Sequence, residues 1–161
     1  MKLTLDELAG AVDLFGGLTR EELIQGCEDI CARSGEVIDF EFINDKIENA
    51  IEKYYLVELK ERGLLVIGPV ALPKLPEGGE DLPHLIQVEN RLINKKEIEK
   101  IVFERMEEEI KVNSFEEDLE SLERLLDICY DIEIWSSGGI EEARKALEKR
   151  VDRMRKNKVV T

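Results

Sequence analysis

Three cysteines and a single histidine are the residues of this chain whose types best suit zinc binding. Cys27 and Cys31 are four residues apart, about one turn of a helix. Cys129 and His84 would complete a set of four ligands. Structural zinc sites usually take C-x2-C pairs from loops, whereas Cys27 and Cys31 fall within an apolar helical stripe. Because a free cysteine packs as a small hydrophobic residue, we predict that all three belong to the core, with no metal and no cofactor.

His84 is the one side chain whose ordinary pKa suits general acid–base catalysis near neutral pH. The carboxylates of Glu80 and Asp81 precede it and would raise its pKa or orient its ring. No serine, cysteine or lysine close to it forms a recognisable nucleophile constellation. A histidine after Leu-Pro in a proline-rich segment more often fixes a loop by hydrogen bonding. We therefore predict no catalytic residue, and a small enzyme centred on His84 remains the second alternative function.

Acidic runs and glycine pairs add no sign of catalysis. The runs 107–109 and 116–118 are expected on solvated helix faces, whereas paired catalytic carboxylates need a shared concave site. The three Gly-Gly pairs match neither G-x-G-x-x-G nor the P-loop, so no phosphate-binding loop is indicated.

Composition and charge are those of a folded, acidic protein of 161 residues with a net charge of −14. The longest uncharged run, residues 63–73, is too short for a membrane span, which needs about 20 apolar residues. The first residues lack the apolar stretch of a signal peptide, and an odd number of cysteines suits a reducing compartment. We therefore expect a cytoplasmic protein with no membrane partner.

The elements that position these residues begin at recognisable helix caps. T-x-x-E capping boxes start at Thr4 and Thr19, and Asp39 can cap a third helix. Two β-prone runs at 56–59 and 64–67 then flank a short loop that ends in Gly63, a residue free to turn left-handed. Three helices followed by a hairpin are the order of a winged helix. Apolar residues recur at helical spacing after each cap: Leu5, Leu8, Val12 and Phe15; Leu23, Cys27, Ile30 and Cys31; Ile43, Ile47, Ala50, Ile51 and Tyr54.

The charge of the third predicted helix bears on what such a module would bind. A helix that reads DNA usually offers Arg, Lys, Asn or Gln to bases and phosphates. Here acidic residues outnumber basic ones, and phosphates would repel them. We interpret the module as the protein-binding variant of its fold. The acidic residues are Glu41, Asp45, Glu48 and Glu52, against Lys46 and Lys53.

A proline-containing strap, residues 71–93, follows the winged-helix-like half at 1–70. The segment 69–90 holds all four prolines and the histidine, so an interior helix or central strand is not expected there. Its leucines can pin it to a core as an ordered strap, with an exposed turn at 77–81 and a short strand at 85–88. Binding residues concentrate in loops held by a rigid scaffold. The predicted binding residues are Glu80, Asp81, Pro83 and His84.

Residues 94–161 are expected to form a helical half within the same compact domain. Caps at Asn94–Glu97 and Ser114–Glu117 precede two helices. The second of them shows a two-heptad apolar seam: Phe115, Leu119, Leu122, Leu126 and Cys129. The last helix has one apolar face of Ile140, Ala143, Leu147, Val151 and Met154.

The last helix is also basic, since residues 144–161 carry eight of the 23 basic residues and only two of the 37 acidic residues. Basic side chains near a helix C-terminus complement the helix dipole, and we favour that interpretation. The acidic body repels phosphate, so nucleic acid is expected to bind only weakly, through residues 144–158.

Three stretches, LTLDELAGAVDLFGGLTREEL, LLVIGPVALPKLPEGGEDLPHLIQVE and LLDICYDIEIW, carry a resemblance to a known family. In the same order, and over nearly the whole chain, they resemble small archaeal proteins of unknown function, best represented in haloarchaea. Those proteins run LTxDELAGVVDLFGALTREEL, PxxPxxPExxEDxPHIL and LLDxSYDxExW. Cys129 stands where that family often has Ser, which weakens the zinc hypothesis further. The resemblance implies a cytosolic archaeal origin and no transferable activity.

Together these observations predict a mainly α-helical protein with a small β-hairpin. Its predicted function is that of a non-enzymatic protein-interaction or regulatory module. A DNA-associated regulator that uses the basic last helix is the first alternative.

Overall fold

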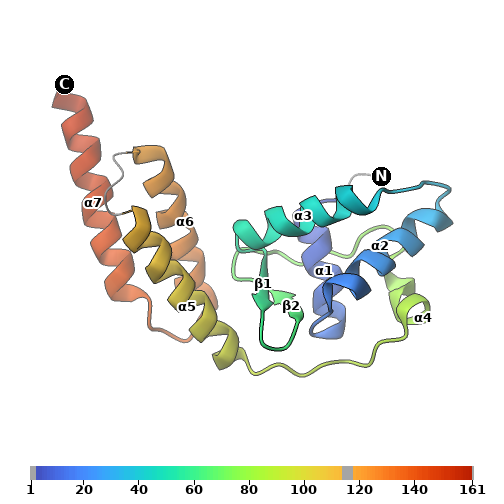
Figure 1. Ribbon diagram of the computed structural model, residues 1–161. Helices are drawn as coiled ribbons and strands as arrows, with labels where there is room; N and C mark the ends of the chain where they lie inside the picture. The colour runs from blue at the N-terminus through green and yellow to red at the C-terminus, as the bar shows by residue number, and fades with distance from the viewer. Residues whose placement is uncertain (1–2, 114–117, 161) are drawn as a thin grey trace. The chain divides into compact units, whose positions relative to one another are not determined.

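The protein is mainly helical with one small antiparallel hairpin, as the sequence predicts (Figure 1). The structure is a computed structural model and describes residues 3–113 and 118–160, without the side chains of the last two. Its internal contacts divide the chain into two compact units, Met1–Asn94 and Lys95–Thr161.

Unit 1 begins with three helices, α1 (Leu5–Phe15), α2 (Arg20–Arg33) and α3 (Phe40–Glu52). Both predicted capping boxes are confirmed. The Thr4 and Thr19 side chains each accept from the backbone N–H three residues on, and the Glu7 and Glu22 carboxylates accept in turn from the Thr4 and Thr19 backbone N–H groups. Asp39 caps α3 by accepting from the Glu41 N–H. These caps satisfy backbone donors that a helix start would otherwise leave unpaired.

The hairpin pairs β1 (Leu56–Leu59) with β2 (Leu64–Ile67), with Val57 opposite Val66. Gly63 has a φ of +64° in the connecting loop, the left-handed conformation that its position predicts. An isolated antiparallel bridge joins Leu18, between α1 and α2, to Leu65. Its N–H···O distances are 3.0 and 2.7 Å, so β2 lies between β1 and the Leu18 segment.

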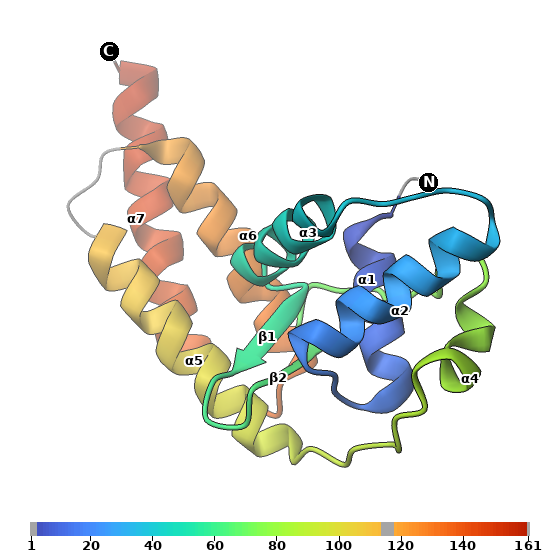
Figure 2. The ribbon, with the colours of Figure 1, turned by 45° about the vertical axis from the view of Figure 1, so that its right-hand side comes forward.

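The core of unit 1 lies between α1, α2, α3 and the hairpin (Figure 2). The apolar stripes of the first two helices are buried at the predicted positions from Leu8 to Cys31. Tyr54 is fully buried, but α3 ends at Glu52 and Tyr54 has a φ of +66°, so it is not part of the helix that its spacing suggested. A left-handed tyrosine costs about 1–2 kcal/mol, which burial of its ring offsets.

The expected strand at 85–88 is wrong, because Leu85 and Ile86 end a helix and residues 87–88 belong to no strand. A 3-10 turn η1 (Gly79–Asp81) leads into α4 (Leu82–Ile86), after which Gln87 turns left-handed with a φ of +43°. Pro83 lies in the first turn of α4, where a missing N–H removes no helical bond. Leu82 and Ile86 are four residues apart and both line the contact with α2, so a helical turn buries them together.

Unit 2 consists of α5 (Lys95–Val112), α6 (Leu119–Trp135) and α7 (Glu141–Val160). The predicted seam of α6 is buried at Leu122, Leu126 and Cys129, while Leu119 is half-buried. The Ser114–Glu117 cap and Phe115 lie outside the described residues. The apolar face of α7 is confirmed at its centre, where Leu147 and Val151 are buried.

Polar contacts fix the connection from α6 to α7. The buried carboxylate of Glu99, on α5, accepts from the Ser137 backbone N–H at 2.7 Å and from its hydroxyl at 3.2 Å. One helical turn earlier, Lys95 donates to the Trp135 carbonyl and lies over its indole ring. These bonds pair the Trp135 carbonyl and the Ser137 N–H, two backbone groups that would otherwise hydrogen-bond to water.

Candidate functional site

The strap is part of unit 1 and is bound to α1 at both of its ends. Near its start, the Leu72 N–H donates to the Asp6 carboxylate at 3.0 Å, and the Lys74 N–H to the Asp6 carbonyl at 3.2 Å. The Lys74 backbone lies so close to Gly10 that a Cβ there would overlap it. Near its end, the Arg91 N–H donates to the Phe15 carbonyl at 2.7 Å. The segment between these contacts is therefore held rather than free.

Arg91 also forms the strongest polar contact of the strap. Its guanidinium donates to both carboxylate oxygens of Glu22, at 2.5 and 3.0 Å, and to the Gly17 carbonyl at 3.1 Å. A bidentate arginine–carboxylate pair of this kind is among the stronger hydrogen-bonded pairs in proteins. The Arg91 hydrogen bond is the main reason that the pKa of Glu22 lies below its ordinary value.

Between these ends, the predicted binding residues lie on η1 and α4. Glu80, Pro83 and His84 are exposed, whereas Asp81 is half-buried. The Asp81 carboxylate accepts from the Arg33 guanidinium, at the end of α2, at 2.8 Å. Both side chains of this pair are about half exposed to solvent, so it contributes at most about 1 kcal/mol. Three of the four predicted residues can therefore meet a partner without rearrangement.

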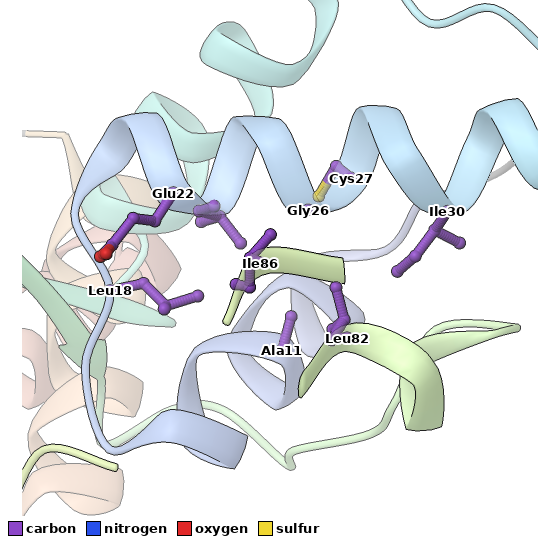
Figure 3. A pocket seen from close by; sticks show the side chains of 9 residues that line it. Ala11, Leu18, Glu22, Gly26, Cys27, Ile30, Leu82 and Ile86 are labelled. Atoms are coloured by element: carbon purple, nitrogen blue, oxygen red, sulfur yellow. The ribbon is translucent and has the colours of Figure 1, made fainter. Parts of the chain in front are cut away.

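The face of α4 opposite these residues packs against α1 and α2 (Figure 3). Leu82 and Ile86 reach Gly26, and a Cβ on Gly26 would come within 3.0 Å of Leu82 Cδ2. The seam between the helices has no space for even a water molecule, so it supports α4 and cannot bind a ligand. Burial raises the pKa of Cys27, which lines the seam, to about 12.

An open groove of about 490 Å³ follows α6 in unit 2 and is lined mainly by acidic side chains. Two of these acidic side chains form hydrogen bonds within unit 2. Asp118 caps α6 and accepts from the Ser121 hydroxyl, and Glu123 accepts from Arg155 at 3.0 Å. Neither this groove nor the seam includes His84.

The acidic residues of α3 lie on its solvent side. Glu41, Asp45, Glu48 and Glu52, here called the acidic stripe, are exposed and spaced by four, three and four residues. Glu48 accepts from Arg20 at 2.7 Å, and Arg20 also contacts Asn44 and Glu58. Arg20 thus links α2, α3 and β1 at one edge of the stripe.

Sequence reasoning missed three exposed apolar side chains around the start of α3. Val37, Phe40 and Phe42, here called the apolar group, are 98, 56 and 41% exposed. The Lys46 ammonium lies 5.6 Å from the centre of the Phe42 ring. A signal was present only at Phe42, which falls outside the helical spacing of the buried Ile43, Ile47 and Ala50. Phe40 lies three residues before Ile43 and keeps that spacing, so the pattern places it with the core residues although it is exposed.

The candidate zinc ligands do not share one environment. All three cysteines are buried, and burial also raises the pKa of Cys129 to about 12, whereas His84 is exposed. Within residues 3–113 and 118–160, no three histidine, cysteine or acidic side chains converge as metal ligands. The expectation of a metal-free protein stays a prediction, which elemental analysis tests. Over the same residues, no helix has the length and apolar character to cross a bilayer.

These features define a mainly helical protein with a hairpin, whose predicted site residues lie on an exposed helix rather than in a cleft. The chain belongs to a family of unknown function (DUF7109), whose model matches residues 6–152. Neither the curated proteins nor the solved structures include a significant match.

Proposed function

We propose that the protein is a non-enzymatic protein-interaction module with a winged-helix-like unit 1. The order of elements supports this arrangement: α1, the Leu18 bridge segment, α2, α3 and then the hairpin, with β2 central. In winged-helix and related modules the helix in the position of α3 commonly faces the ligand. The side chains exposed on α3 therefore indicate which class of ligand the module binds.

The exposed apolar group carries the proposal. Aromatic side chains are enriched at the centres of protein interfaces, and Phe40 and Phe42 lie exposed beside the acidic stripe. A phosphate backbone would be repelled by these carboxylates and would gain nothing from the phenyl rings. A protein partner with an apolar patch bordered by basic residues would match both features.

The second proposed contact is the exposed side of η1 and α4, with Glu80, Asp81, Pro83 and His84. Its support is rigidity: the Gly26 seam and the ends of the strap fix the backbone, so little conformational entropy would be lost on binding. From the sequence resemblance we further infer an archaeal source and a cytoplasmic location.

Affinity capture from a native extract tests this function with variants that preserve the fold. We expect Glu80→Ala with Asp81→Ala, and separately His84→Gln, to reduce recovery of the co-purifying protein several-fold. Loss of the half-exposed Arg33–Asp81 pair costs at most about 1 kcal/mol, so the Tm should fall by no more than about 4 °C.

The matched control is Glu107→Ala with Glu108→Ala, which removes two adjacent exposed carboxylates from α5. It should leave recovery at the wild-type level. Equal recovery by all variants would show that η1 and α4 are not the contact. A large loss of Tm with unchanged capture would assign these residues a structural role instead.

A further inference from the structure

Six of the eight basic residues of α7 fall into two sets that point in different directions. Arg144 donates to both oxygens of Glu133 on α6, at 2.8 and 3.1 Å, and Arg155 donates to Glu123 at 3.0 Å. These two arginines are eleven residues apart, about three turns, and therefore lie on one side of the helix. They are committed to holding α6 against α7.

A second set, here called the basic stripe, consists of Lys145, Lys149, Arg153 and Lys156, all exposed. Their spacing of four, four and three residues puts them on one face, roughly opposite the buried Leu147 and Val151. The stripe is about 16 Å long at 1.5 Å per residue. Glu142 and Asp152 lie at its margins, so the face remains net positive.

The helix dipole does not account for this stripe. Stabilisation of basic residues by the C-terminal end of a helix falls off within the last turn. The helix ends at Val160, so Lys145, Lys149 and Arg153 lie beyond that range. Neutralisation of the acidic body does not account for the stripe either, because basic residues scattered over the surface would serve that purpose as well as four on one exposed face.

We propose that the basic stripe of α7 contacts the phosphate backbone of a double-stranded nucleic acid. This proposal is independent of the protein contacts assigned to unit 1. Phosphate contacts need only cations and hydrogen-bond donors, which the stripe supplies.

Other occupants fit the stripe less well. A protein interface needs an apolar or aromatic core, and an interfacial membrane helix must insert an apolar face. The apolar face of α7 is already used, because Ile140, Leu147 and Val151 are at most 1% exposed. The stripe itself has no large apolar side chain.

The expected affinity is modest and strongly dependent on salt, because the chain carries a net charge of −14. If three or four phosphates are neutralised, log K should fall against log salt with a slope of about −3. The stripe makes no contact that distinguishes bases, so duplexes of different sequence should bind alike.

Fluorescence anisotropy with labelled duplex DNA and duplex RNA tests the proposal on the full chain. The variant Lys149→Glu, Arg153→Glu, Lys156→Glu should weaken binding at low salt at least tenfold. Because three new glutamates beside Glu148 and Asp152 add like-charge repulsion along α7, Lys149→Gln, Arg153→Gln, Lys156→Gln provides a second variant without that repulsion. It should lose most of the affinity and reduce the salt slope towards zero.

The control Lys53→Glu, Lys74→Glu, Lys100→Glu makes the same change in net charge at exposed sites elsewhere. It should retain most of the affinity, since only long-range repulsion increases. Equal losses in control and stripe variants would overturn the proposal, as would absence of duplex binding at low salt. Binding to phosphatidylserine vesicles but not to duplexes would assign the stripe to membranes instead and also overturn it.

Discussion

Arg91 joins two parts of unit 1 that are distant in sequence. Its guanidinium holds Glu22, the residue that also completes the Thr19 capping box, so one carboxylate serves both the start of α2 and the end of the strap. Both side chains are about two-thirds buried or more. A charged pair with this degree of burial contributes more than a surface pair.

The Glu22–Arg91 pair predicts a dependence of stability on pH. The pKa of Glu22 is lowered in the folded protein, so the pair stabilises the fold above the ordinary carboxyl pKa of 4.5. This stability is lost as the pH falls through the lowered folded value. Arg91→Gln should therefore reduce the free energy of unfolding by about 1–2 kcal/mol at pH 7 and by much less near pH 3.

Urea denaturation at the two pH values measures this difference. Lys53→Gln removes an exposed positive charge from the same unit and should change stability by less than about 0.5 kcal/mol at either pH. An Arg91→Gln deficit of the same size at both pH values would mean that lost packing, rather than the ion pair, is responsible.

At the scale of elements, the crossing of the strap over α1 depends on Gly10. A Cβ there would overlap the Lys74 backbone, which cannot move without breaking the two hydrogen bonds to Asp6. Gly10→Ala should cost about 2–3 kcal/mol by overpacking and should detach the start of the strap. Trypsin should then cleave faster after Lys74.

Gly63→Ala is the matched control. An alanine at position 63 would be strained by the φ of +64°, but its Cβ would meet nothing within 4 Å. It should cost only about 1–2 kcal/mol and leave cleavage after Lys74 unchanged. If Gly10→Ala is no more harmful than Gly63→Ala, the close crossing at Lys74 does not constrain the strap.

Local signals predicted the elements whose causes are local. The caps at Thr4, Thr19 and Asp39 and the loop at Gly63 follow from neighbouring residues, and the structure confirms each. The expected strand at 85–88 is wrong because α4 is set by its contact with α2, to which the strap sequence gives no clue.

At the candidate site, too, features that depend on tertiary contacts could not be predicted from the sequence. The exposure of Glu80 and His84 followed from a proline-rich turn, but the support beneath them did not. Arg91 and Glu22 are 69 residues apart, and no spacing rule links them. The exposure of the apolar group could not be predicted, because a phenylalanine in the sequence resembles a core residue until the buried face of α3 is known.

Over the whole molecule, each unit has a charged helix face, and the two faces have different surroundings. In unit 1 the acidic stripe lies beside the apolar group, while in unit 2 the basic stripe has no large apolar neighbour on its face. The two surfaces therefore suit chemically different ligands. Of these, the protein contact through unit 1 is the one on which the proposed function depends.

Site-specific photo-crosslinking tests whether unit 1 contacts a protein through these surfaces. p-Benzoylphenylalanine is placed singly at Phe40, at His84 and, as the control, at Glu107, all of which are exposed. After illumination in a native extract, we predict discrete protein adducts at Phe40 and His84, with the same partner identified by mass spectrometry, and none at Glu107. Adducts at Glu107 without adducts at Phe40 and His84 would contradict the assignment of the protein-binding surface to unit 1.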